Sequence, residues 1–80
     1  MNERQKSDIR DYVIRRCMEE LGFTPPKNQI RLLECSGYDL PVKDFRNKRV
    51  YKPDYVMFAV GDHEYQVGDQ YFVRYNAYGR

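Results

Sequence analysis

The segment from Lys43 to Tyr55 holds the residue types best suited to binding a nucleic acid. Five cations alternate with three aromatic residues, namely Lys43, Arg46, Lys48, Arg49 and Lys52 with Phe45, Tyr51 and Tyr55. Such cations pair with phosphates while exposed rings stack on bases. Asp44 and Asp54 lower the local excess across residues 41–60 to +3. The segment therefore makes single-stranded or structured nucleic acid one candidate partner.

Acid–base and metal chemistry have much weaker candidates. His63, beside Asp62, is the one histidine, and a nucleophilic pair with it would need Cys17 or Cys35. Both cysteines stand among apolar residues and are predicted to point inward, whereas His63 is predicted to sit exposed at a hairpin turn. With no CxxC pair, a zinc site is not expected, although a single disulfide between the cysteines stays open. We expect no catalytic residue, no metal site and no cofactor.

The chain is predicted to begin with an amphipathic helix over residues 3–21, which would help to position these residues. Apolar residues recur every four positions at Ile9, Val13, Cys17 and Leu21. The charged residues Arg15, Arg16, Glu19 and Glu20 are expected mostly on the other side. Gly22 suits the left-handed position after a helix, and the two prolines at 25 and 26 forbid its continuation.

Four strands are predicted after the helix. Residues 30–35 form the first, with Ile30 and Leu32 on one face and Leu33 and Cys35 on the other. Residues 36–53 are predicted to be an irregular loop, and such a loop is long for a small domain. Residues 55–60, 64–67 and 70–75 follow as three strands joined by Gly-Asp turns.

This order predicts an α+β fold in which one helix packs on a four-stranded antiparallel sheet, the last three strands forming a meander. The helix is expected to cover the more aliphatic face. The opposite face should be partly exposed and rich in tyrosine, with Tyr71, Val73 and Tyr75 on one side of the last strand. A strongly curled, SH3-like small barrel with an amino-terminal helix is the alternative fold.

The balance of residues favours binding over catalysis. The 80-residue chain has eight tyrosines, and its net charge of +2 is too small to indicate a nucleic-acid or membrane partner by itself. Tyrosine and arginine are enriched at protein interfaces. We therefore expect a non-enzymatic protein-interaction module, an inhibitor, adaptor or regulatory accessory protein, with nucleic-acid binding through 43–55 as the alternative. The expected binding residues are Lys43, Arg46, Lys48, Arg49, Tyr51, Lys52, Tyr55, Tyr71 and Arg74.

The remaining expectations concern domain number and location. Residues 1–80 are long enough for one domain. The first residues lack the apolar stretch of a signal peptide, and the longest apolar run, from Tyr55 to Val60, is far shorter than the ~20 residues that span a membrane. We expect a cytoplasmic chain whose partner is a protein or a second copy, with no membrane contact.

Overall fold

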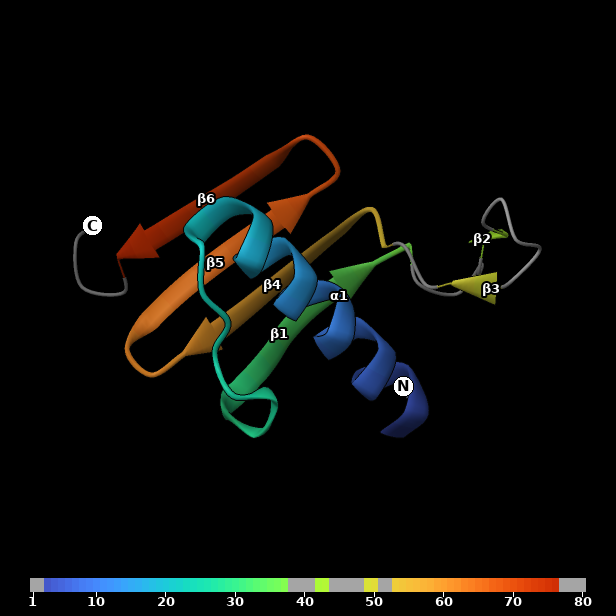
Figure 1. Ribbon diagram of the computed structural model, residues 1–80, viewed down its shortest axis with the longest axis horizontal. Helices are drawn as coiled ribbons and strands as arrows, with labels where there is room; N and C mark the ends of the chain where they lie inside the picture. Colours follow the sequence, from blue (N-terminus) through green and yellow to red (C-terminus); the bar gives the residue numbers. More distant parts are fainter. Residues whose placement is uncertain (1–2, 38–41, 44–48, 51–52, 77–80) are drawn as a thin grey trace.

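The computed structural model describes residues 3–37, 42–43, 49–50 and 53–76. Helix α1 is followed by a short 3-10 turn, η1, and six strands (Figure 1). Their bounds are α1 Glu3–Leu21, η1 Lys27–Gln29, β1 Ile30–Ser36, β2 Val42–Lys43, β3 Arg49–Val50, β4 Tyr55–Val60, β5 His63–Gly68 and β6 Tyr71–Asn76. The predicted helix 3–21 and the predicted strand 55–60 are confirmed. The predicted strands 30–35 and 64–67 are one and two residues longer in the structure, and the predicted strand 70–75 is shifted by one residue.

Helix α1 ends where the glycine after it can take a conformation that other residues avoid. Gly22 has a φ of +81°, and its N–H donates to the carbonyl of Met18 over 3.1 Å. This bond satisfies one of the carbonyls that the end of a helix leaves without a partner. Residues 23–29 then lead the chain to the start of β1.

Strands β1, β4, β5 and β6 form one antiparallel sheet in that order. Two-residue turns at 61–62 and 69–70 join the last three strands into the expected meander. The sheet is open, because β1 and β6 are its two edges and do not pair with each other. The fold is therefore the predicted helix on a four-stranded sheet, and the alternative of a closed, SH3-like barrel is wrong.

The predicted faces of the first strand need a correction. A β-bulge shifts the register of β1 against β4, so that Leu32 pairs with Phe58 and Glu34 pairs with Met57. The extra residue, Leu33, interrupts strict alternation. As a result Cys35 pairs with Val56 and packs against the core, on the face where Leu32 lies, instead of on the opposite one.

The core lies between α1 and one face of the sheet. The most deeply buried side chains are those of Ile9, Val13, Cys17, Ile30, Val56, Phe58 and Val67. The Phe58 ring stacks on Tyr65 with centroids 5.1 Å apart and meets the edge of Phe72 at 6.2 Å. Alternate residues of β4 and β5 reach this core, which leaves the other residues of the strands for the opposite face.

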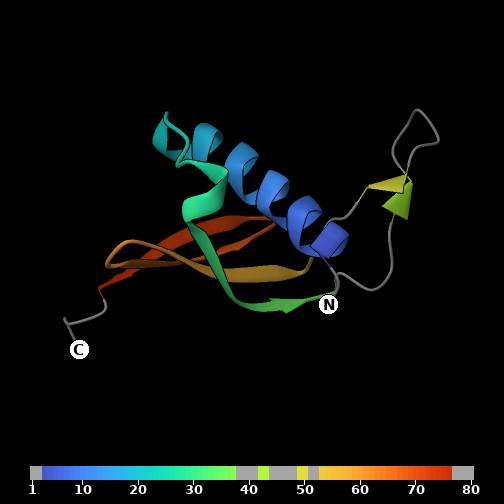
Figure 2. The same ribbon diagram turned by 90° about the horizontal axis from the view of Figure 1, so that it is seen from below.

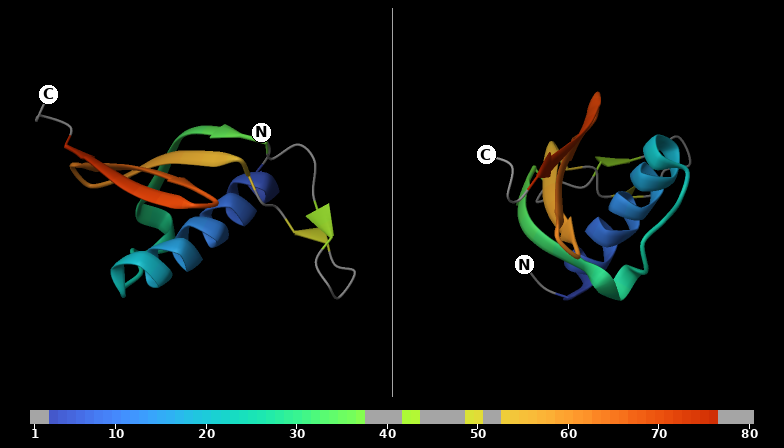
Figure 3. Two further views of the ribbon diagram at one scale, coloured as in Figure 1. Left: turned by 90° about the horizontal axis from the view of Figure 1, so that it is seen from above. Right: turned by 90° about the vertical axis from the view of Figure 1, so that its left-hand side faces the viewer.

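Strands β2 and β3 form a separate two-stranded ribbon within the stretch predicted to be irregular. The ribbon lies beyond the ends of β1 and β4, away from the layer formed by α1 and the main sheet (Figures 2 and 3). At its base the Asp54 N–H donates to the Ser36 carbonyl over 2.7 Å. Gly37 is required there, because a Cβ on it would lie 2.8 Å from the Asp54 backbone nitrogen.

Candidate functional site: the face of the sheet opposite the helix

The face of the sheet that α1 does not cover is the candidate site, and we call it the back face. It consists of every residue of the sheet whose partner register places it opposite the core side. These residues are Arg31, Glu34, Ser36, Tyr55, Met57, Ala59, Glu64, Gln66, Gly68, Tyr71, Val73 and Tyr75, to which we add the exposed, bulged Leu33. Figure 3 shows α1 on one side of the sheet only, so within the described part of the chain no helix covers this face.

The Tyr71 ring lies against Gly68, the residue with which it pairs across the last turn. A Cβ on Gly68 would come within 2.3 Å of the Tyr71 ring, so the ring occupies the space that any other residue would fill. Tyr55 pairs with Gly68 from the other side, in β4. Its hydroxyl donates to the Glu34 carboxylate, and this hydrogen bond raises the pKa of Tyr55.

Gln66 links the two tyrosines of β6. Its side-chain nitrogen donates to the Tyr71 hydroxyl over 2.8 Å, and its carbonyl oxygen accepts from the Tyr75 hydroxyl over 3.0 Å. A single amide therefore fixes the positions of two rings that stand four residues apart on one strand. Both rings are oriented although neither is buried.

The back face is apolar and open at its β6 side. Tyr71, Val73 and Tyr75 keep 40%, 42% and 41% of their surface exposed, which is high for large apolar residues aligned along a strand. Leu33, which the bulge displaces, is 49% exposed. Ionisable groups of both signs, Arg31, Glu34 and Glu64, flank the tyrosines. The face is thus aromatic with mixed charge and has no basic stripe.

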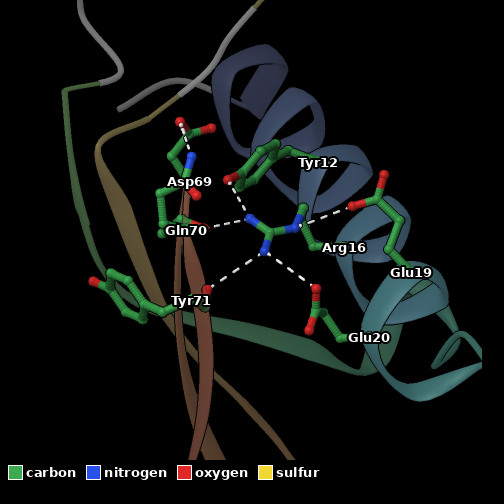
Figure 4. Close-up of polar contacts among 8 residues, drawn as sticks. Tyr12, Arg16, Glu19, Glu20, Asp69, Gln70 and Tyr71 are labelled. Atoms are coloured by element: carbon green, nitrogen blue, oxygen red, sulfur yellow. Dashed lines mark hydrogen bonds and ion pairs between the residues drawn. The ribbon is translucent and has the colours of Figure 1, made fainter.

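Arg16 fixes the hairpin that carries this face to α1 (Figure 4). Arg16 is 8% exposed, and its guanidinium donates to the carbonyls of Gly68 and Tyr71 and to the Tyr12 hydroxyl. Glu19 lies 3.1 Å from its Nε on the solvent side. Burial opposes the charge, but the hydrogen bond to Tyr12 and the nearby carboxylates outweigh it and raise the pKa of Arg16.

The sequence placed Arg16 on the polar side of the helix, and that assignment is wrong. Position 16 follows Ile9 by seven residues and Tyr12 by four, which is the spacing of the buried face. Because arginine is charged, this spacing was not recognised as that of a buried residue. Its buried position is acceptable because hydrogen bonds and ion pairs satisfy its guanidinium, and no buried side-chain nitrogen or oxygen of the described residues lacks a partner.

The predicted binding residues fall into three groups. Tyr55 and Tyr71 meet at Gly68 on the back face. Arg74 pairs with Tyr65 and so belongs to the opposite face, where it is exposed. Lys43 and Arg49 pair with each other in the β2–β3 ribbon. The other four, Arg46, Lys48, Tyr51 and Lys52, lie outside the described residues.

Sequence reasoning also missed members of the back face. Gln66, Val73 and Tyr75 were not among the predicted binding residues, although Val73 and Tyr75 share a face with Tyr71 by simple alternation. Gln66 gave no signal in isolation, because only the register of β5 against β6 places it between the two tyrosines. Leu33 was hidden by the bulge.

The residues considered for catalysis, His63, Cys17 and Cys35, do not form a nucleophilic pair in the structure. His63 is exposed at the start of β5, 6.5 Å from the Tyr65 ring centroid. Cys17 is buried, and desolvation raises its pKa to about 11, so its thiol stays protonated near neutral pH. No disulfide joins Cys17 to Cys35. Across residues 3–37 and 53–76 and the short ribbon, no three His, Cys, Asp or Glu side chains cluster as metal ligands would.

Two further observations complete the description. Among the described helices none is both long enough and apolar enough to cross a membrane. Comparison with protein-family models, with curated proteins and with solved structures gives no match to this chain.

Proposed function

We propose that this chain is a non-enzymatic, cytoplasmic binding module that docks on a protein partner through its back face. The observation that carries the proposal is the row of exposed apolar residues Tyr71, Val73 and Tyr75, with both rings oriented by Gln66. Rings that are already ordered lose little conformational entropy on binding, which favours affinity. Tyrosine at the centre of an apolar patch with a polar rim is typical of protein interfaces.

The charge distribution supports a protein over a nucleic acid as the partner. A nucleic-acid interface needs cations that neutralise phosphates beside the stacking rings. The described back face instead mixes Arg31 with Glu34 and Glu64, and Arg74 is on the other side of the sheet. Lys43 and Arg49, which pair in the β2–β3 ribbon, are expected to add polar contacts to the same partner.

The test compares two sets of substitutions in partner capture by the full chain. Tyr71→Ala with Tyr75→Ala removes both oriented rings, whereas Arg46→Glu with Arg49→Glu reverses the charge of the basic segment. The proposal predicts that the tyrosine pair abolishes capture of a defined partner and that the charge pair weakens it. Glu3→Ala with Arg4→Ala, on exposed positions of the first turn of α1, is the matched control and should capture normally.

A parallel binding experiment separates the two partner classes. Oligonucleotide binding by the basic segment would weaken steeply as salt increases, with a log–log slope of about −2 to −4 for a few phosphate contacts. Capture that survives the tyrosine pair but is lost with the charge pair, together with such a slope, would contradict the proposal and establish the nucleic-acid alternative.

A further inference from the structure

The two edges of the sheet differ in how well they are protected. At β1 the bulge at Leu33 breaks the regular row of backbone groups, and Arg10 donates to the Ile30 carbonyl over 3.0 Å. Bulges and covering side chains are the usual means by which proteins block pairing at a sheet edge. At β6 the register against β5 is regular over all six residues, and the strand contains no proline, glycine or lysine.

The backbone groups that β6 offers outward can be identified from its hairpin. Gly68 and Tyr71 close a two-residue turn, so this pair exchanges both of its hydrogen bonds across the hairpin. Backbone hydrogen bonding then alternates along β6, so the backbone groups of Val73 and Tyr75 also bond to β5. The N–H and carbonyl groups of Phe72, Arg74 and Asn76 therefore point away from β5, toward the outer boundary of the sheet at the upper left of Figure 1.

We propose that this outer edge pairs antiparallel with the same edge of a second copy of the chain, around a two-fold axis at Val73. The two sheets then form one continuous sheet of twice the width, with both helices on one side. The inference does not rest on the proposed function, because the edge can pair whether or not the back face binds another protein. Two-fold homodimers are the commonest oligomers, and their interfaces must be self-complementary.

Charge and side-chain type select this register among those available. With the axis at Val73, Val73 faces its own copy and Tyr71 faces Tyr75 of the second chain. On the other side of the sheet Arg74 faces Phe72, and a cation beside a ring is favourable. With the axis at Arg74, two guanidinium groups would oppose each other across the strands, which is destabilising. The strand is thus complementary to itself in one particular alignment.

The first test removes an outward N–H while leaving the back face intact. Arg74→Pro deletes a donor that no bond to β5 uses, and edge strands tolerate proline at such positions. Arg74→Thr removes the charge but keeps the N–H, and it is the matched control. Sedimentation from about 1 µM to about 1 mM, a range that covers weak to moderate affinities, should show wild type and Arg74→Thr approaching twice the 9.7 kDa chain mass. Arg74→Pro should remain at the mass of one chain, with an unchanged circular dichroism spectrum.

The second test reports on the register and does not depend on how well the proline variant folds. Val73→Cys places one thiol on the axis, where directly opposed residues of a non-hydrogen-bonded pair have Cα atoms ~4.5 Å apart, within disulfide range. Tyr75→Cys is the control, because its two copies would be about 13 Å apart along the strands. Mild oxidation should cross-link the first variant far faster than the second, with wild type as the baseline for Cys17 and Cys35.

Three outcomes would overturn the inference. They are a single-chain mass for wild type at every concentration, a dimer that Arg74→Pro leaves unchanged, and equal cross-linking of the two cysteine variants. Pairing of this edge with an extended peptide of another protein, while the chain itself stays monomeric, would also overturn it. None of these results bears on capture through Tyr71 and Tyr75, so this inference and the proposed function can fail separately.

Discussion

The two faces of the sheet are made by the same strands but are ordered by different forces. On the side of α1, Val56, Phe58 and Val67 are fully buried and are positioned by close packing. On the back face, Tyr71 and Tyr75 are positioned by hydrogen bonds to Gln66 and stay about two-fifths exposed. The first arrangement provides the stability of the fold. The second keeps apolar surface ordered and accessible, which is the property that a docking site requires.

The largest expected loss of stability comes from removing a side chain from the packed face. Phe58→Ala removes a fully buried ring that touches Tyr65 and Phe72, and such changes cost about 3–5 kcal/mol. A domain of this size has only about 4–12 kcal/mol of stability. Met57→Ala, at the neighbouring half-buried position of the back face, should cost about 1 kcal/mol. Urea denaturation of both variants measures the contrast, and equal losses would contradict the division between the faces.

Substitution of Arg16 should cause the next largest loss of stability, because this side chain connects α1 to the β5–β6 hairpin that carries the back face. Arg16→Met keeps the apolar stem but leaves the Gly68 and Tyr71 carbonyls without this donor, at an expected cost of about 2–3 kcal/mol. Arg16→Lys should fall between Met and wild type, since one ammonium cannot reproduce the fork of a guanidinium. Amide exchange should increase first in β5 and β6. Loss of protection confined to α1 would refute this role.

A smaller effect is expected where Tyr71 covers Gly68. Gly68→Ala places a methyl group against the ring and should cost about 1–2 kcal/mol, with a change in the near-ultraviolet signal of tyrosine. In a Tyr71→Ala background the same substitution should cost much less, because the obstacle is gone. A double-mutant cycle measures this coupling. Equal costs in both backgrounds would show that the ring does not occupy that position.

The smallest expected effect is a pH dependence at Tyr55. Its pKa is raised in the folded chain by the hydrogen bond to Glu34, so folding favours the protonated hydroxyl. This contribution to stability is complete below the unfolded pKa of about 10 and disappears as the pH rises through the folded value. Ultraviolet titration should show a late component that is lost in Tyr55→Phe and titrates earlier in Glu34→Gln. A titration curve identical in wild type and Glu34→Gln would contradict the interaction.

The fold was largely predictable because its local signals agree with one another. The four-residue spacing from Ile9 to Leu21, the stop at Gly22 and the Gly-Asp turns each fixed one element correctly. The bulge at Leu33 was missed because strict alternation puts Cys35 on the face of Leu33, and only the register against β4 reveals the one-residue shift that moves Cys35 to the face of Leu32. The ribbon of β2 and β3 was also missed, because two-residue strands carry almost no periodicity.

The site was predictable only in part. Alternation along the last strand placed Tyr71, Val73 and Tyr75 together, as expected. It also separates Arg74 from them, which the predicted set of binding residues had ignored. The contributions of Gln66 and Arg16 depend on contacts between residues far apart in the chain, one across a strand pair and the other 52 residues away at Gly68. Such contacts are fixed by register and packing and cannot be read locally.

Chemical nitration of the tyrosines tests the central claim most directly, because it measures which rings are open before and after binding. In the Arg74→Pro chain, which should be monomeric, Tyr71 and Tyr75 should react readily, while Tyr12, 5% exposed in the core, should not. In the complex with a captured protein partner, Tyr71 and Tyr75 should become protected. Protection of these rings in the free monomer, or full reactivity in the complex, would contradict the account of the back face as an ordered, open docking surface.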